Sequence, residues 1–296
     1  MSYSVFEYRF SDLSLMPHRP ERSHKGRFGR VLCVCGSRGM AGASYLSALG
    51  ALRTGAGLCE ILCPEENRII LQTLIPEAVL SVYDRSCPDE STVLSAIARA
   101  DAIVVGCGLG TDTAALSLLR TVLRNRGDVT TVVDADALTL LSAHPSLLRA
   151  ARGCILTPHA SEMSRLCGLG IASVLAEREA LCHDFAAAHG VVCVLKDHHT
   201  AVSDGLGTLY RNQSGNSGMA TGGSGDVLTG IIAAIAAQAH GSLTPLQIAS
   251  LGVFLHGLAG DAAAERLSPY AMLAHDVADS LGDVFLRARQ ENVLSY

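Results

Sequence analysis

The stretch best suited to chemistry runs from Met219 to Ile235 and reads MATGGSGDVLTGIIAAI. Three glycines and a serine at 222–225 precede one carboxylate, Asp226, and an apolar run of good helix formers. A helix start leaves unpaired backbone N–H groups and a partial positive charge, and glycines let a ligand approach those groups closely. The sequence therefore predicts an anion hole, of the kind that binds phosphate, at Gly222, Gly223, Ser224 and Gly225.

The carboxylate at this helix mouth has two explanations. In one, Ser224 or Asp226 caps the helix. In the other, Asp226 accepts the proton of a hydroxyl group that attacks a phosphate bound in the anion hole. A cap needs one polar side chain and no run of glycines, so the full string favours the second explanation. The positive end of the helix dipole would then keep Asp226 ionised at neutral pH.

Alternating strand and helix patterns surround this stretch. Strands are expected at 30–36, 57–64, 77–84, 101–108, 129–136, 153–159 and 191–196, helices at 41–55, 91–100, 112–126, 161–168 and 173–190, an antiparallel pair at 200–205 and 207–212, and helices through the C-terminal third. Near-continuous apolar strands separated by helices indicate a mostly parallel sheet covered on both faces. Ligands of such folds bind beyond the carboxyl ends of the strands. The polar or glycine-rich strand ends GSRGMAGA, GCGLGTD, DADAL, TPHASE and KDHHT are therefore expected to ring one pocket.

The composition restricts the class of protein. The 296 residues are 49% hydrophobic and 17% charged, enough for the core of one α/β domain. A net charge of −5 and the absence of Trp disfavour nucleic-acid binding. No uninterrupted apolar run has the roughly 18 to 20 residues that span a bilayer, and no signal-peptide core is present. The ten cysteines lack metal-binding spacings and lie mostly in strand-like runs, so we expect buried thiols in a reducing cytoplasm.

Two other nucleotide-binding patterns fit poorly. The string VVGCGLGTD is similar to a dinucleotide fingerprint, which would indicate an oxidoreductase. Its third glycine comes one position early, and it lies in the middle of the chain. A GxxxxGK[ST] motif, which would indicate a P-loop enzyme, is absent.

An ordered set of motifs resembles ADP/ATP-dependent NAD(P)H-hydrate dehydratases. The motifs are HKGRFGRVLCVCGSRGMAGA, ALRTGAGL, GCGLG, DADAL, LTPHASEM, VLK, GNSGMATGGSGDVLTGIIAA and HGLAGDAA, and they extend from His24 onward. The resemblance implies a ribokinase-like, three-layer α/β/α domain over residues 24–296, with residues 1–23 as a polar lead-in. It also implies a stand-alone dehydratase, because the epimerase domain that is fused in some members has no counterpart in this sequence.

The resemblance further implies a repair reaction on nicotinamide nucleotides. ADP or ATP would phosphorylate the ring hydroxyl of the S-form of NADH-hydrate or NADPH-hydrate, and elimination of phosphate would restore the ring double bond, which makes the enzyme a hydro-lyase. Asp226 would be the base, and the backbone N–H groups of Gly223 to Gly225 would stabilise the transferring group. We also expect Mg²⁺ with ligands unknown, a homo-oligomer with a tetramer as one possibility, and functional pairing with a separate epimerase.

Motif positions assign further residues. The hydrate site would contain Ala43, Gly108, Gly110, His159, Glu162 and Asp226, and the nucleotide site Lys196, Asp197, His198, His199, Thr200, Asn216, Met219, Ala220, Thr221 and Gly225. Two side chains have alternative interpretations. Glu162 is either a substrate-facing residue or a charge in the first turn of a helix. His256 is either a neighbour of adenine or a core histidine, and the core position is favoured. His198 and His199 are interpreted as a loop pair rather than a metal site.

Two positions depart from the family pattern. Cys107 stands where the family has Pro, which alters only the stiffness of the loop. Asp197 stands where the family has Gly, and we expect it to face ribose or solvent because a clash with phosphate would weaken an anion site. Two rival functions remain at this stage: a ribokinase-like kinase of a small alcohol such as a vitamin precursor, and a non-catalytic nucleotide-binding regulator.

Overall fold

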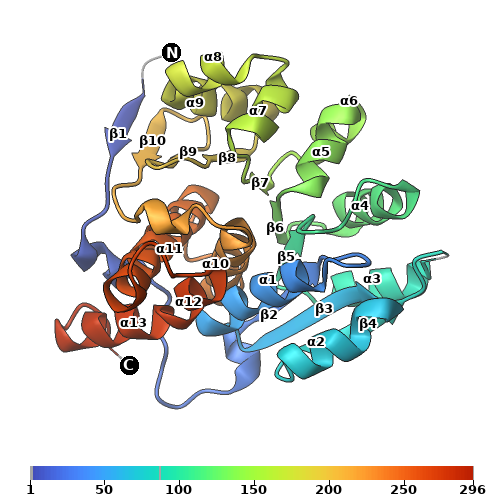
Figure 1. Cartoon of the computed structure of the whole chain (residues 1–296), viewed down its shortest axis with the longest axis horizontal. Helices are drawn as coiled ribbons and strands as arrows, with labels where there is room; N and C mark the ends of the chain where they lie inside the picture. The colour runs from blue at the N-terminus through green and yellow to red at the C-terminus, as the bar shows by residue number, and fades with distance from the viewer. Residues whose placement is uncertain (1–2, 87, 296) are drawn as a thin grey trace.

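The fold is built on one mostly parallel sheet, in a computed structural model that describes residues 3–86 and 88–295. The strand order is β1-β10-β9-β8-β7-β6-β5-β2-β3-β4, running from upper left to lower right in Figure 1. Strand β9 is antiparallel to β8 and to β10, and the pairs from β8 to β4 are parallel. The strands are β1 (Ser4–Phe6), β2 (Arg30–Val34), β3 (Leu58–Pro64), β4 (Val79–Tyr83), β5 (Ala102–Val105), β6 (Thr130–Val133), β7 (Ile155–Leu156), β8 (Val192–Leu195), β9 (Ala201–Ser203) and β10 (Thr208–Arg211).

Helices cover both faces of this sheet (Figure 1). They are α1 (Ala41–Arg53), α2 (Arg68–Leu74), α3 (Glu90–Ala98), α4 (Thr113–Asn125), α5 (Asp136–Ala143), α6 (Pro145–Ala150), α7 (Ala160–Cys167), α8 (Ile171–Ala176), α9 (Arg178–His189), α10 (Ser224–Ala239), α11 (Pro245–Leu267), α12 (Ala274–Asp279) and α13 (Leu281–Gln290). The three-layer α/β/α arrangement predicted from the sequence is confirmed.

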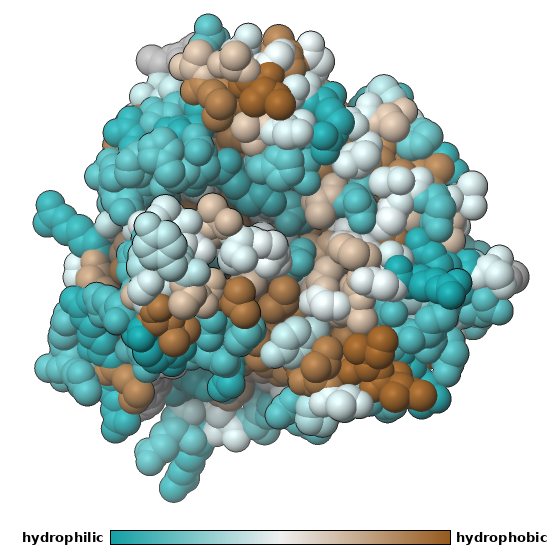
Figure 2. Space-filling view, viewed as in Figure 1, coloured by the Kyte–Doolittle hydropathy of each residue, from teal (hydrophilic) through white to brown (hydrophobic). Residues whose placement is uncertain are grey.

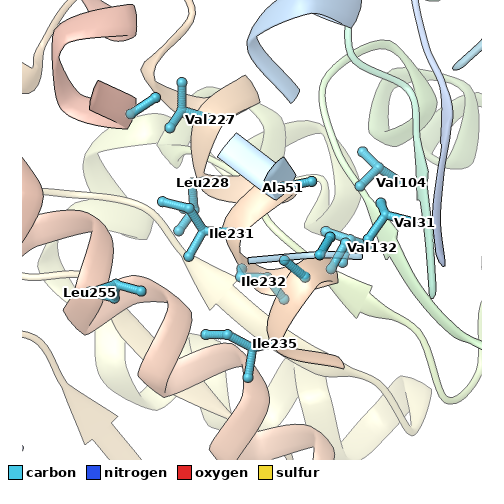
Figure 3. Close-up of a cluster of buried hydrophobic side chains, with 14 of the residues drawn as sticks. Val31, Ala51, Val104, Val132, Val227, Leu228, Ile231, Ile232, Ile235 and Leu255 are labelled. Carbon is cyan, nitrogen blue, oxygen red and sulfur yellow. The ribbon is translucent and has the colours of Figure 1, made fainter. Parts of the chain in front are cut away.

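The core is divided by the sheet into two layers, because successive strand side chains point to opposite faces. On β2, Val31 and Cys33 pack with α1, α10 and α11, whereas Leu32 and Val34 pack with α3 to α9. Figure 3 shows the first layer, where Ile232 and Ile235 of α10 lie between Val132 of the sheet and Leu255 of α11. Helix α10 is therefore buried along nearly its whole length, which fixes the position of its N-terminus.

Helix α11 is long and apolar enough to cross a membrane by length and composition, but 78% of its most apolar window is buried inside the protein. It packs against α10, α12 and α13. The burial is that of a core helix in a globular domain.

Three segments differ from the expectations. The lead-in joins the domain, because β1 pairs with β10 in parallel and Leu13 of a short 3₁₀ helix (Phe10–Leu15) is buried. The helix expected at 173–190 is two helices, α8 and α9, interrupted at Glu177. Helix α2 was not expected, and it shows three exposed apolar side chains, Ile69, Ile70 and Leu74.

Candidate functional site

The predicted anion hole forms the start of α10. Gly223 is the N-cap residue, its φ of 91° lies in the left-handed region, and no side chain caps the helix. A Cβ atom at Gly223 would lie 2.3 Å from a methyl carbon of Leu46, so only glycine fits there. Because neither Ser224 nor Asp226 acts as the cap, the capping interpretation of this string is wrong. The first N–H groups of α10 remain directed out of the helix, as an anion site requires.

Asp226 lies in the first turn of α10 beside the ends of two strands. One oxygen of Asp226, one oxygen of Asp134 after β6 and the Cys107 sulfur after β5 all lie within 4.8 Å of one another. Burial and the negative charge of Asp134 raise the pKa of Asp226 to about 7. Burial therefore opposes the ionisation of Asp226 that was expected from the helix dipole, and the pKa of this carboxyl group lies near neutral pH. A carboxyl group that titrates near neutral pH suits a general base.

Lys196 follows β8 and points into the same centre. Its Nζ lies 2.7 Å from Asp134 Oδ1 and 4.0 Å from Glu162 Oε2. Burial disfavours the charge of Lys196, but Asp134 and Glu162 outweigh this effect and raise its pKa. A Cβ atom at Gly225 would lie only 3.3 Å from Nζ, so the ammonium group adjoins the anion hole.

His159 and Glu162 form a capping box at the start of α7. His159 Nδ1 accepts hydrogen bonds from the N–H groups of Ser161 and Glu162, at 3.1 and 3.3 Å, and Glu162 Oε2 accepts one from the His159 N–H at 2.8 Å. Glu162 is only 6% exposed, and burial raises its pKa to about 7. The first-turn interpretation of Glu162 is confirmed, because its carboxyl group caps α7. Glu162 also faces Lys196, and its contact with a substrate stays a prediction.

The residues assigned to the hydrate site come from two glycine-rich turns. Gly108, with φ of 59°, lies so close to the first turn of α1 that a Cβ atom would be 2.8 Å from Ala43 Cβ and 3.0 Å from Met40 Cβ. The Gly110 N–H donates to Asp136 Oδ2 at 2.8 Å. The structure thus brings Ala43 and Gly108 together at the carboxyl ends of β2 and β5.

Asp197 has a partner that the sequence did not predict. Its carboxylate forms an ion pair with Arg178 at the start of α9 and is held by the His198 N–H at 2.8 Å. The Asp197 side chain keeps 26% of its surface exposed, and its contact with ribose stays a prediction. Arg178 neutralises the carboxylate, which removes the repulsion of phosphate considered from the sequence.

The other residues of this loop lie close together. His199 Nδ1 is 3.1 Å from the Asn212 carbonyl oxygen, and Thr200 Oγ1 donates to the Asp197 carbonyl oxygen at 3.0 Å. The rings of His198 and His199 are 4.4 Å apart. This is the loop pair that the sequence indicates.

The segment before α10 is held by α11. Asn216 Nδ2 donates to Asp261 Oδ1 at 3.0 Å, and the Gly215 N–H donates to Asp261 Oδ2 at 2.9 Å. Met219 packs against Gly260, where a Cβ atom would be 2.2 Å from its sulfur. Ala220 and Thr221 then lead into the anion hole. His256 on α11 is buried with Nε2 3.4 Å from Ser224 Oγ, and burial lowers its pKa to about 4, as for a neutral core histidine.

Two residues of the site, Asp134 and Asp261, were not assigned to it from the sequence. Asp134 is the first residue after a buried strand, which is where ligand-facing groups of such sheets lie. Asp261 belongs to the quoted motif HGLAGDAA, whose spacing to Asn216 is visible only in the folded chain.

The described residues do not form a Mg²⁺ cage of their own. Mg²⁺ prefers hard oxygen ligands in octahedral geometry. The donors that gather here are a thiol and two carboxylates, and Lys196 already occupies one oxygen of Asp134. Magnesium would therefore enter as the ion of a nucleotide, held mainly by phosphate oxygens.

Comparison with known proteins gives consistent matches. Residues 31–282 match the protein family described as NAD(P)H-hydrate dehydratase. The ADP-dependent (S)-NAD(P)H-hydrate dehydratase of Neisseria meningitidis is 40% identical over 264 residues, 88% of this chain and 86% of the relative. The bifunctional NAD(P)H-hydrate repair enzyme Nnr of Moorella thermoacetica is 39% identical over 94% of this chain, which spans only 53% of that protein.

Solved structures share the fold. The ADP/ATP-dependent NAD(P)H-hydrate dehydratase of Bacillus subtilis, co-crystallised with ATP and Mg²⁺, superposes with a TM-score of 0.80 at 28% identity, over 94% of this chain and 97% of that one. A ribokinase-like superfamily protein of Enterococcus faecalis superposes with a TM-score of 0.82 at 30% identity, over 96% of each chain.

Proposed function

The chain belongs to the NAD(P)H-hydrate dehydratase family, and from that premise we propose that it converts the S-form of NADH-hydrate or NADPH-hydrate to NADH or NADPH with ADP or ATP as co-substrate. The observation that carries the proposal is the position of Asp226. A half-buried carboxyl group with a pKa of about 7 adjoins a glycine-lined helix start at the carboxyl end of the sheet. This is where a hydroxyl group and a phosphate have to meet for phosphoryl transfer.

Asp226 would begin the reaction as the general base. Its carboxylate takes the proton of the ring hydroxyl while the oxygen attacks the terminal phosphorus, and the nucleotide leaves one phosphate shorter. The N–H groups of Gly223 to Gly225 stabilise the charge of the transferring group. Loss of inorganic phosphate and of a ring proton then forms the ring double bond. Phosphorylation is needed because hydroxide is a poor leaving group and phosphate is a good one.

The substrates would occupy two sides of α10. The hydrate site is proposed at Ala43, Gly108, Gly110, His159 and Glu162, and the nucleotide site at residues 196–200, Asn216, Met219 to Thr221 and Gly225. The contact of Ala43 with Gly108 and the bracing of Asn216 by Asp261 support this division. The two groups converge at the anion hole.

Incubation with hydrated NADH, ADP or ATP, and Mg²⁺ tests the function. The reduced-nicotinamide absorbance should return, with release of one phosphate for each NADH formed. A kinase of a small alcohol would leave a stable phosphorylated product, and a regulator would bind nucleotide without turnover. Absence of the absorbance return under saturating nucleotide would contradict the proposal.

A divalent cation should be required. Nucleotide phosphates need their charge neutralised during transfer, and the donors that gather in the described part of the site are one thiol and two carboxylates rather than a set of hard oxygen ligands. We expect excess chelator to lower turnover at least about 100-fold and added Mg²⁺ to restore it. Full activity in chelator would exclude this requirement.

The setting of the enzyme is proposed from its relatives. The fused relatives indicate a partner epimerase acting on the same hydrates, and we propose that this chain works with such an epimerase in the cytoplasm. A homo-oligomer, with a tetramer as one possibility, is also proposed. The exposed apolar residues Ile69, Ile70 and Leu74 on α2 form a patch at the lower right of Figure 2 that such contacts would cover.

A further inference from the structure

The ion pair of buried Asp134 and half-buried Lys196 is not explained by binding of a nucleotide in the 197–200 loop. Lys196 immediately precedes that loop, yet its side chain points to Asp134, which is 2% exposed, and to the first turn of α10. An ammonium group carries three N–H donors. Among the described residues only Asp134 accepts a hydrogen bond from Lys196, while Glu162 lies at 4.0 Å. Donors therefore remain beside the anion hole.

We propose that Lys196 is a catalytic residue whose ammonium group binds the terminal phosphate of the nucleotide opposite the N–H groups of α10, and that Asp134 is the residue that positions it. This inference rests on the proposed function, and it divides the 196–200 segment into two parts. Lys196 contacts the phosphate that is transferred, whereas residues 197–200 bind the remainder of the nucleotide.

The energetics favour a role at the reacting group. A buried lysine is costly unless it is paired, and Asp134 supplies the partner. A cation fixed before the substrate arrives stabilises negative charge on the phosphoryl group without reorganisation during the reaction. The first N–H groups of α10 face the same space, so a phosphate between them and Lys196 would contact positive charge from both sides.

The alternative is a purely structural brace. The pair joins the end of β6 to the end of β8 across β7, and it could serve only to hold these strands together. A brace and a phosphate ligand make different predictions for nucleotides that differ only in their terminal phosphate.

Lys196→Met separates these roles, because it keeps the length of the side chain and removes the charge. In titration calorimetry with Mg²⁺, we expect ADP affinity to fall about tenfold and AMP affinity to stay within twofold. In turnover, we expect kcat to fall at least about 100-fold, because the contact strengthens as charge develops. Equal changes in ADP and AMP affinity, or a kcat within threefold of wild type, would overturn the assignment of Lys196.

Asp134→Asn tests the positioning role. The variant should lower kcat, and adding it to Lys196→Met should cause no further loss, because Asp134 acts through Lys196. Losses that multiply in the double variant would overturn that role. The double variant leaves no unpaired charge at positions 134 and 196. It can therefore be used for the ADP and AMP titrations if either single variant fails to fold.

The pH profile gives a second readout. Asp226 is faced by Asp134 from the end of β6, Cys107 from β5, Cys35 from β2 and Lys196 from β8. Removing the negative charge of Asp134 should move the acid limb of kcat/KM to lower pH. Such a shift would show that Asp134 carries a negative charge beside Asp226, as a partner of the Lys196 ammonium group requires. An unchanged midpoint would overturn the positioning role of Asp134.

Glu60→Gln is the matched control. Glu60 is 1% exposed and pairs with Arg30 and Arg99 at 3.0 and 2.6 Å, on β3 outside the site. It should lower the unfolding temperature as the site variants do, but leave the ratio of ADP to AMP affinity and the pH midpoint at wild-type values.

The ADP and AMP titrations need no hydrate, so they test the phosphate role separately from the proposed function. If wild type fails to restore NADH but Lys196→Met still loses its preference for ADP over AMP, the proposed function is wrong and the phosphate role of Lys196 stands. If wild type restores NADH but Lys196→Met keeps that preference, the proposed function stands and the phosphate role of Lys196 is wrong.

Discussion

At the scale of single residues, Asp226 is the proposed base, and its removal would distinguish a site that performs chemistry from one that only binds. It makes no cap for α10, whereas Asp89 accepts hydrogen bonds from Ser91 and Thr92 and caps α3. We therefore expect Asp226→Asn to lower turnover by about 10² to 10⁴ while ADP still binds, because the general base is lost and the anion hole is kept. Rates of NADH return and calorimetric titration measure the two effects. Asp89→Asn is the control, and turnover above one tenth of wild type in Asp226→Asn would show that Asp226 is not the base.

The same residue sets the pH dependence. Burial and Asp134 raise the pKa of Asp226 to about 7, and the base has to be ionised to accept a proton. The rate constant kcat/KM should therefore be low at pH 6, rise through about pH 7 and level off above pH 8. A profile of NADH return from pH 5.5 to 9 checks this, and a flat acid limb would be incompatible with Asp226 as the titrating base.

The sequence predicts the parts of the site that depend on residues close together along the chain, and it does not predict the parts that depend on contacts between distant segments. The position of Asp226 follows from a local string, because helix starts and glycines act within a few residues. The direction of Lys196 toward Asp134 joins residues 62 positions apart, and the Arg178–Asp197 pair depends on how α9 packs beside β8. Such contacts are fixed by packing, so the orientation of Asp197 could not be inferred from its type alone.

At the scale of elements, the long apolar patterns and the local β9–β10 pair were predicted from the sequence, whereas the distant pairing of β1 was not. Strands such as β2 and β5 are buried on both faces and appear as continuous apolar runs. Strand β1 has only three residues and is stabilised by β10, about 200 residues later in the chain. Its sequence carries no local signal of this partner. The break between α8 and α9 likewise lies in a continuous helical pattern, with no glycine or proline to mark it.

The position of α10 depends on close contact with α1. A Cβ atom at Gly230 would lie 2.0 Å from the Ser47 carbonyl oxygen, and one at Gly50 would lie 2.4 Å from the Val227 carbonyl oxygen. Gly230→Ala should therefore push the helices apart, lower stability by about 1 to 3 kcal/mol and reduce turnover through a displaced anion hole. Gly282→Ala on α13, where a Cβ meets nothing within 4 Å, should be neutral or stabilising. Urea unfolding of both variants checks this, and equal stability would contradict the close-contact argument.

At the scale of the whole molecule, function and stability oppose each other at this site. Three carboxyl groups, Asp134, Glu162 and Asp226, share a largely buried centre with one ammonium group, and the pKa values of Glu162 and Asp226 are raised to about 7. The rest of the sheet is covered by two continuous apolar layers, which stabilise the fold enough to tolerate this excess of acid. Such a cluster is typical of an active site rather than of a structural core.

The consequence is a pH-dependent stability that Asp226→Asn should remove in part. The folded pKa of Asp226, about 7, lies above the ordinary value of 3.8 for this carboxyl group, so the folded chain binds more protons than the unfolded chain between these values. The stabilisation by this group is complete below pH 3.8 and is lost as pH rises through 7. Asp226→Asn, which stays neutral, should therefore exceed wild type in stability by about 1 to 3 kcal/mol at pH 8, with the difference shrinking toward pH 5. Thermal unfolding at both pH values measures this, and an equal or lower unfolding temperature of the variant at pH 8 would show that ionised Asp226 does not destabilise the folded chain.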